Sequence, residues 1–339
     1  MTTYTDLYLR ANLSDVGGIP GQGAMCTSPD IIPWGTEPVP DPTNHFADFS
    51  KDQSQALLWG NTNYIYTRAT NLAVGDEAGE LHLYWSRASL INYPFLWSDQ
   101  SISCVSGSSL NYSAQNTNQE IVGAQPFVWT PQVVVSANDH ICLISQMVTP
   151  KNPNPIPLAS NISDFAAFIQ SNRGFAWKNI NIQNLPAVPA GSVPDWSTKV
   201  NYDQGEMAAN IFVVLVLNNV PIGSKVNFTC GGPGPDPMLH MEKTEVIQAN
   251  QVSGVTSKIP ANFSAPITYN LWLSGNKPPI PNMPTSITLE AHYIPGEREA
   301  KQLRAMPIHQ GRLANFHIDS NIKPLVGVPV GSFTTTTVA

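Results

Sequence analysis

The sequence is poor in charge, in cysteine and in long apolar runs. Charged residues make up 12% of its 339 residues, which is about half of the usual share. The chain has 17 Lys and Arg against 24 Asp and Glu, a formal net charge of −7. No nucleic-acid partner is expected, because phosphate binding depends on clustered Lys and Arg. Hydrophobic residues still make up 42%, so the composition indicates a folded chain.

No apolar run is long enough to cross a bilayer. The longest, Ile211–Leu217, has the length of a buried strand. Residues Met1–Arg10 lack the basic and apolar regions of a signal peptide. We therefore expect no transmembrane segment. We expect a protein that is made in the cytoplasm without a signal peptide and is released, if at all, by a non-classical route.

Sequence motifs for catalysis and metal binding are also missing. There is no G-x-S-x-G, H-E-x-x-H or P-loop motif, and none of the four cysteines forms a C-x-x-C pair. Cys142 lies in an apolar run, which favours a buried free thiol. A disulfide between Cys104 and Cys142 is the alternative. Three aspartates could be calcium ligands, but turn-forming carboxylates are the favoured interpretation: Asp6, Asp15 and Asp30. We predict a non-enzymatic protein with no cofactor and no metal.

The residues that are abundant indicate β-structure. The 30 prolines and 23 glycines are spread over the chain, which suits short strands rather than long helices. Asn63–Ser86 alternates with period two on both sides of a turn at Ala73–Gly79, and this predicts an antiparallel hairpin with one buried face. Similar strands recur in the second half, for example Ala208–Asn218 and Ser286–Ile294. We predict an all-β fold of two tandem antiparallel β-sandwich, immunoglobulin-like domains with an extended C-terminal tail.

Proline-rich and apolar stretches suggest the domain boundaries. We expect an N-terminal sandwich over 1–184, a linker over 185–197, a second sandwich over 198–295 and a tail over 296–339. The tail is apolar and extended near its end. It is predicted either to pack across its own domains or to add to the sheet of a neighbouring copy. Its candidate assembly residues are Leu325, Val326, Val328, Val330 and Phe333.

Several segments carry a family resemblance. They are DLYLR (Asp6–Arg10), SPDII (Ser28–Ile32), NYIYTRATN (Asn63–Asn71), LHLYWS (Leu81–Ser86), Asp139–Met147 and Phe175–Ile182. Together they resemble the bacterial immunoglobulin-like, CARDB-like accessory modules of exported proteins, over about residues 4–183. The resemblance implies an immunoglobulin-like sandwich without an activity of its own. Ala11 departs from the pattern, which usually has Asp there, and the second half is not recognised.

Aromatic residues are the candidate binding residues. Trp59, Tyr93 and Trp97 lie close in sequence to the predicted hairpin, and a sugar-binding face would use such rings as stacking platforms. Core filling is the favoured interpretation for Trp97. Trp272 alternates with Leu271 and Leu273, so it points to the opposite face of its strand and is a candidate surface anchor.

Three functions follow as hypotheses. The leading one is a non-enzymatic binding or assembly protein of a bacterial extracellular, toxin-associated or secretion-associated type, acting through protein–protein contacts as a homo-oligomer or with a protein partner. The alternative is a membrane-acting, pore-forming toxin or effector, because Ser98–Gly123 is rich in Ser, Asn and Gln. The second alternative is a lectin-like protein that binds a glycan.

Overall fold

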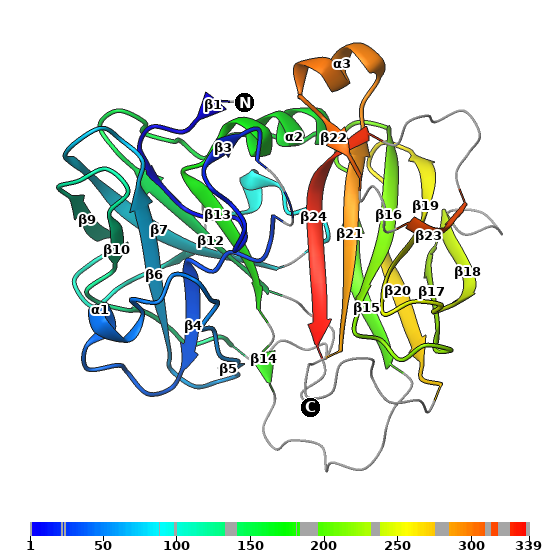
Figure 1. Ribbon diagram of the computed structural model, residues 1–339, viewed down its shortest axis with the longest axis horizontal. Coiled ribbons are helices and arrows are strands. Elements are labelled where there is room, and N and C mark those ends of the chain that lie inside the picture. Colours follow the sequence, from blue (N-terminus) through cyan, green and yellow to red (C-terminus); the bar gives the residue numbers. More distant parts are fainter. Residues whose placement is uncertain are drawn as a thin grey trace. The chain divides into compact units, whose positions relative to one another are not determined.

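The computed structural model describes residues 2–21, 23, 25–87, 89–97, 100–132, 141–180, 182–183, 196–231, 238–274, 285–308, 313–317 and 326–336. Its internal packing divides the chain into two compact units. Unit 1 comprises 1–88, 92–159 and 167–188, and unit 2 comprises 89–91, 160–166 and 189–339. Both are built mainly of antiparallel sheets (Figure 1), so the predicted all-β class is confirmed.

Unit 1 contains two five-stranded sheets. The first is centred on β6 (Asn63–Asn71), whose partners are β2 (Leu7–Tyr8), β4 (Ile31–Gly35), β10 (Glu120–Val122) and β11 (Phe127–Trp129). The second has the order β13 (Phe175–Ile180), β12 (Ile141–Val148), β7 (Glu77–Arg87), β8 (Ser101–Ile102), and β9 (Leu110–Ala114) also pairs with β7. The minor elements are β1 (Thr2–Thr3), β3 (Gly18–Ile19), β5 (Leu57–Leu58), β14 (Ile182–Gln183), α1 (Pro42–His45) and the 3-10 helix η1 (Pro94–Leu96).

The predicted hairpin between β6 and β7 is wrong. The two strands do not pair with each other, since β6 belongs to the first sheet and β7 to the second. Side chains from both sheets form one apolar core, including Ile65 and Ala69 of β6 and Leu81 and Leu83 of β7. The alternating pattern correctly marked inward-facing positions on each strand. It could not tell whether the next strand lies beside the first or across the core from it.

Both faces of β6 are covered, which also differs from the expected single buried face. Ile65 and Ala69 face the core, yet Tyr66 and Arg68 on the other side are fully buried as well. Tyr66 packs on the ring of Phe46, with ring centroids 4.8 Å apart. The segment after β4 therefore forms an additional layer over the first sheet.

An aromatic cluster covers the outer face of the second sheet. It consists of Trp97, Phe175 and Trp177 together with Phe168 of helix α2 (Ile162–Ser171). Trp97 has no exposed surface, and its ring nitrogen donates to Asn92 Oδ1 at 3.2 Å. Large rings with satisfied polar atoms are a stable filling for such a layer.

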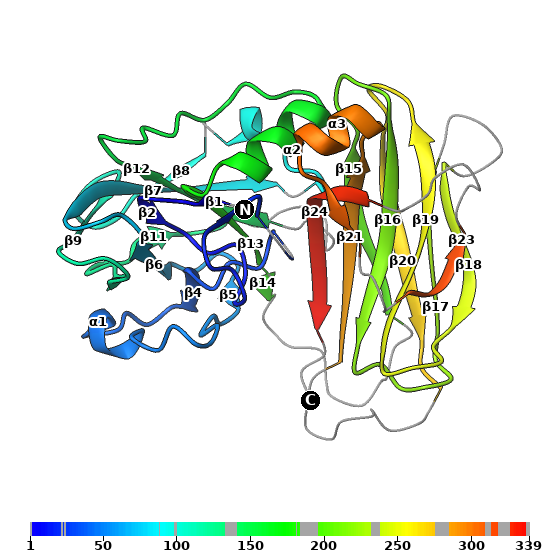
Figure 2. The same cartoon turned by 45° about the horizontal axis from the view of Figure 1, so that its top comes forward.

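Unit 2 contains two further sheets, which Figure 2 shows as two layers. The four-stranded sheet has the order β15 (Trp196–Asp203), β20 (Ser264–Trp272), β17 (Lys225–Cys230), β18 (Leu239–Glu245). The six-stranded sheet has the order β22 (Met306–Pro307), β24 (Val326–Thr336), β21 (Ser286–Ile294), β16 (Ala209–Asn218), β19 (Asn250–Ile259), β23 (Leu313–His317). The rings of Tyr269 and Phe333 pack between the two layers, with their centroids 6.4 Å apart. Helix α3 (Glu297–Gln302) follows β21.

Strand β24 shows where much of the predicted tail lies. It pairs antiparallel with β21 from Ser286↔Thr336 to Tyr293↔Val328, with one irregularity. Val328, Val330 and Phe333 are buried, and Val326 is half-buried. Strand β24 thus belongs to the six-stranded sheet of unit 2. Leu325 and most of the predicted linker 185–197 lie outside the described residues.

Gly254 on β19 tests the packing of the six-stranded sheet. A Cβ at this position would lie 2.3 Å from the carbonyl oxygen of Val213 on the paired strand. We expect Gly254→Ala to lower the free energy of unfolding by about 1–3 kcal/mol, because overpacked backbone must shift. Gly231→Ala is the matched control, since no atom of the described residues lies within 4 Å of its added Cβ. Equal denaturant midpoints for both variants would contradict this packing.

Candidate functional site

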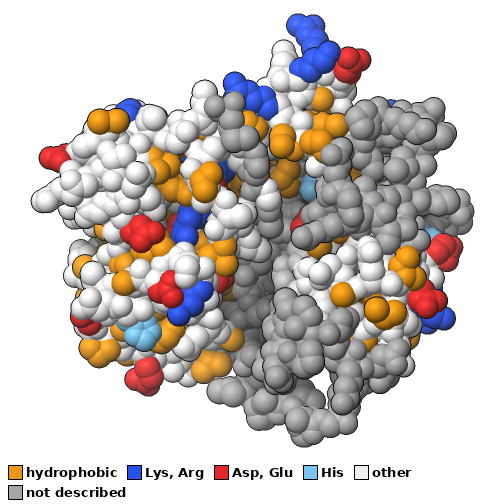
Figure 3. Space-filling model, viewed as in Figure 1, with side chains coloured by type: hydrophobic (Ala, Val, Ile, Leu, Met, Phe, Trp, Pro, Cys, Tyr) orange, Lys and Arg blue, Asp and Glu red, His pale blue; other side chains and the backbone are white. Residues whose placement is uncertain are grey.

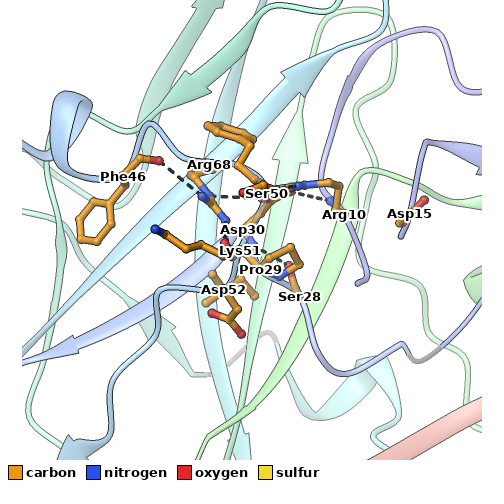
Figure 4. A network of polar contacts seen from close by, with 12 residues as sticks. Arg10, Asp15, Ser28, Pro29, Asp30, Phe46, Ser50, Lys51, Asp52 and Arg68 are labelled. Atoms are coloured by element: carbon orange, nitrogen blue, oxygen red, sulfur yellow. Dashed lines mark hydrogen bonds and ion pairs between the residues drawn. The ribbon is translucent and has the colours of Figure 1, made fainter. Parts of the chain in front are cut away.

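A buried polar cluster of unit 1 centres on Asp30, a residue that the sequence suggested only as a turn former or calcium ligand. Asp30 accepts from the Arg10 backbone N–H at 2.8 Å and from the Arg10 guanidinium at 2.5 Å. Arg68 Nε lies 3.5 Å from the same carboxylate. Figure 4 shows the two arginines converging on Asp30. Its carboxylate is therefore used to neutralise buried arginines of two different segments.

The same arginines hold the segment 46–52 over the first sheet. Arg68 donates to the carbonyl oxygens of Asp48 at 2.7 Å and Pro29 at 2.6 Å, and Arg10 donates to that of Phe49 at 2.7 Å. The Phe49 ring lies against both guanidinium groups, whose central carbons are 5.0 Å (Arg10) and 4.5 Å (Arg68) from its centroid. Burial lowers the pKa of Arg68. These contacts are structural, since they fix a loop of the same unit.

A third buried cation, Lys178 on β13, extends this network. Its ammonium donates to Asp52 Oδ2 at 2.6 Å and to the Ser28 carbonyl at 2.9 Å. Burial lowers the pKa of Lys178. Burial alone would raise the pKa of Asp52, but the charge of Lys178 and hydrogen bonds from Lys178 and Ser54 outweigh it and hold that pKa below its usual range.

The other two aspartates that the sequence suggested as calcium ligands, Asp6 and Asp15, lie in separate environments. Asp6 accepts from Thr149 Oγ1 at 2.6 Å, and Asp15 forms an ion pair with the buried Arg173. In the part of the chain that the structure describes, no three His, Cys, Asp or Glu side chains form a metal-binding group. All four cysteines carry free thiols, and burial raises the pKa of Cys142 well above its ordinary value.

Most of the predicted aromatic binding residues belong to cores. Trp97 is 0% and Tyr93 is 1% exposed, so neither presents a ring face to a ligand. Trp59 is half-buried and packs against the core of unit 1. The segment Ser98–Gly123 supplies β8, β9 and β10, whose inward side chains include Ile102, Leu110 and Tyr112. Over its described residues, this segment is therefore part of both sheets of unit 1.

Trp272 lies on the side of the four-stranded sheet that points away from the core of unit 2. Its neighbour Leu271 is 1% exposed and faces the core, while Trp272 is half-buried on the opposite side. Lys243 Nζ lies 3.7 Å from the centroid of the Trp272 ring, a cation–π contact. Lys225 is the cross-strand partner of Trp272 on β17, and Glu245 is the partner of Lys225 on β18.

Side-chain amides continue this surface beside the tryptophan. Asn270 Nδ2 donates to Asn227 Oδ1 at 2.9 Å across β20 and β17. We call this surface the Trp272 face and define it by Trp272, Asn270, Asn227, Lys225, Lys243 and Glu245. One aromatic ring among lysines and amides can bind a partner by apolar contact and by charge-assisted hydrogen bonds. Its residues include no buried nucleophile.

Charged residues make up 12% of the chain, so few are available for the surface. On the face that Figure 3 shows, the described Lys, Arg, Asp and Glu side chains stand singly or in small groups of both signs. Among the described residues, no helix is long and apolar enough to span a membrane. Recognition at the Trp272 face would therefore depend on a few specific groups rather than on a broad field.

Comparisons with known proteins give distant similarities. No family model matches the chain, and no curated protein matches it. Among solved structures, it is similar to the secreted serine protease VesC from Vibrio cholerae, with 8% identity, a TM-score of 0.23 and coverage of 66% of this chain and 45% of that chain. It is also similar to red sea bream transglutaminase, with 10% identity, a TM-score of 0.18 and coverage of 70% and 27%. The chain spans less than half of either structure, and neither similarity carries a functional argument.

Removing the charge of Asp30 tests the buried network. We expect Asp30→Asn to lower the free energy of unfolding by about 3 kcal/mol or more, because Arg10 and Arg68 would then lack their shared counter-ion. Asp48→Asn is the control, because its pair with Lys51 is exposed and such pairs add little stability. Denaturant unfolding of both variants measures the difference. An Asp30→Asn variant as stable as Asp48→Asn would refute the structural role.

Acid titration tests the Lys178–Asp52 pair. An unfolded Asp has a pKa of about 3.9, and the folded pKa of Asp52 lies lower. The stability that the pair contributes is therefore complete above about pH 4 and is lost as the pH falls through the lower folded pKa. We expect the unfolding free energy of Asp52→Asn to fall less steeply with acid than that of the wild type. Parallel curves below pH 4 would show that the pair contributes nothing.

Proposed function

We propose that this chain is a non-enzymatic binding and assembly protein that acts through protein–protein contacts at the Trp272 face. The observation that carries the proposal is the outward-facing ring of Trp272, with Lys243 Nζ 3.7 Å from its centroid and Lys225 beside it. Tryptophan is enriched among the residues that dominate interface energies. The charged residues buried in unit 1 serve packing, as their partners are other groups of the same unit.

The architecture fits a scaffold role. We propose that the two units are tandem immunoglobulin-like domains. The first is of the CARDB-like type that its sequence segments resemble, in a bacterial extracellular, toxin-associated or secretion-associated setting. β-Sandwich modules of this kind commonly present one sheet face or edge to a partner while the core stays invariant. The four-stranded sheet of unit 2 offers such a face. Its inner side chains Val226, Phe228 and Tyr269 are buried in the core, and the side chains that alternate with them point away from that core.

Self-association of the full chain tests this function. Sedimentation velocity over a wide concentration range should show assembly that rises with concentration. Trp272→Ala should weaken it by about 2 kcal/mol or more, roughly thirtyfold in the dissociation constant, because the central aromatic is lost. Leu158→Ala is the matched control, since Leu158 is an exposed hydrophobic residue of unit 1 (89%).

Deleting the C-terminal residues is a poorer test, because β24 is hydrogen-bonded along β21 of its own sheet. Its removal would strip a strand from the fold as well as any assembly contact. If Trp272→Ala associates as strongly as the wild type, the Trp272 face is not the assembly surface and the proposal fails.

A further inference from the structure

The turn between β6 and β7 carries the most exposed large hydrophobic side chain among the described residues of unit 1. Val74 at its tip is 95% exposed. Val16 is 77% exposed, and it lies near the turn because a Cβ added at the next residue, Gly17, would be 2.3 Å from Leu72 Cδ1. The segment Leu72–Glu80 contains Asp76, Glu77 and Glu80 and no Lys or Arg. The turn thus presents an apolar tip beside carboxylates.

Hydrogen bonds hold this turn in one conformation. Asn71 Nδ2 donates to the carbonyl oxygens of Gly75 at 2.8 Å and Asn116 at 3.0 Å. Asn71 Oδ1 accepts from the Ala73 N–H at 2.9 Å, and the Gly75 N–H donates to Thr117 Oγ1 at 3.2 Å. Gly75 has a φ of 85°, which suits glycine. A turn fixed in this way loses little entropy when a partner binds it.

The Trp272 face is complementary to this turn in both polarity and charge. It offers the Trp272 ring, which Lys243 Nζ already contacts, for an apolar side chain, and it offers two lysines, Lys225 and Lys243, against one carboxylate, Glu245. The turn offers Val74 next to Asp76 and Glu77. The defined residues of the Trp272 face carry one more positive than negative charge, and the turn carries the two carboxylates of Asp76 and Glu77, so the charges of the two surfaces are opposite in sign.

We infer that the partner of the Trp272 face is a second copy of this chain, which inserts its turn Leu72–Glu77 so that Val74 contacts Trp272 and Asp76 and Glu77 meet the lysines. This inference rests on the proposed function. The contact joins two different surfaces, so it is heterologous: each copy donates a turn and accepts one. Successive copies then form a closed ring or an open filament, depending on the rotation between them.

A complementation experiment tests the contact in full-length protein. Val74→Lys places a like charge against the lysines of the face, and Trp272→Ala removes the ring. Each variant alone should associate at least tenfold more weakly than the wild type. A 1:1 mixture should form a dimer of twice 36.8 kDa, because one variant keeps an intact face and the other keeps an intact turn. Sedimentation velocity resolves the dimer from monomers and from the longer wild-type assemblies.

The outcomes separate this inference from the proposed function. If Trp272→Ala weakens assembly while Val74→Lys does not, the turn is not the partner, and the binding role of the face stands. If both weaken assembly but the mixture stays monomeric, the heterologous contact is overturned. If neither variant changes assembly, or the full chain remains monomeric, both proposals fail. Val74 lies at an exposed turn, and equal thermal unfolding of Val74→Lys and the wild type confirms that the variant folds.

Discussion

The carboxylate of Asp30 is the group on which unit 1 most depends. It is fully buried and neutralises two arginines from different parts of the chain, Arg10 before the first long loop and Arg68 in the middle of β6. Those arginines in turn bind the backbone of the segment 46–52. An apolar contact could not replace this arrangement without repacking, because each guanidinium needs several acceptors once it leaves water.

Unit 1 buries several of its cations. In unit 1 Arg10, Arg68, Arg173 and Lys178 are all buried against Asp or backbone oxygens. A chain with few charged residues thus places many of its cations inside, where they fix loops. The lysines of the Trp272 face are different, since Lys225 and Lys243 are exposed on the four-stranded sheet. This contrast is why we assign packing to the first group and recognition to the second.

Sequence patterns predicted some of these features and not others. Period-two alternation correctly separated Leu271 from Trp272, because side-chain direction in a strand is a local property. It failed for β6 and β7, because strand pairing depends on residues far away in the chain. The network around Asp30 had a visible signal, an arginine within the apolar strand pattern of Asn63–Asn71. The sequence could not show that Asp30 is the partner of this arginine, since the two residues are far apart in the chain and only the fold brings them together.

The separation of β6 and β7 into opposite sheets has a consequence for how the chain folds. Neither strand can form a local hairpin with the other, so β6 finds its partners among residues 7–35 and 120–129, and β7 pairs with β12 more than fifty residues later. Such long-range pairing closes large loops before it gains contacts, which slows folding relative to hairpin-rich proteins. During synthesis, the first sheet stays incomplete until β11 has emerged from the ribosome, and until then β6 lacks a neighbour along part of its length.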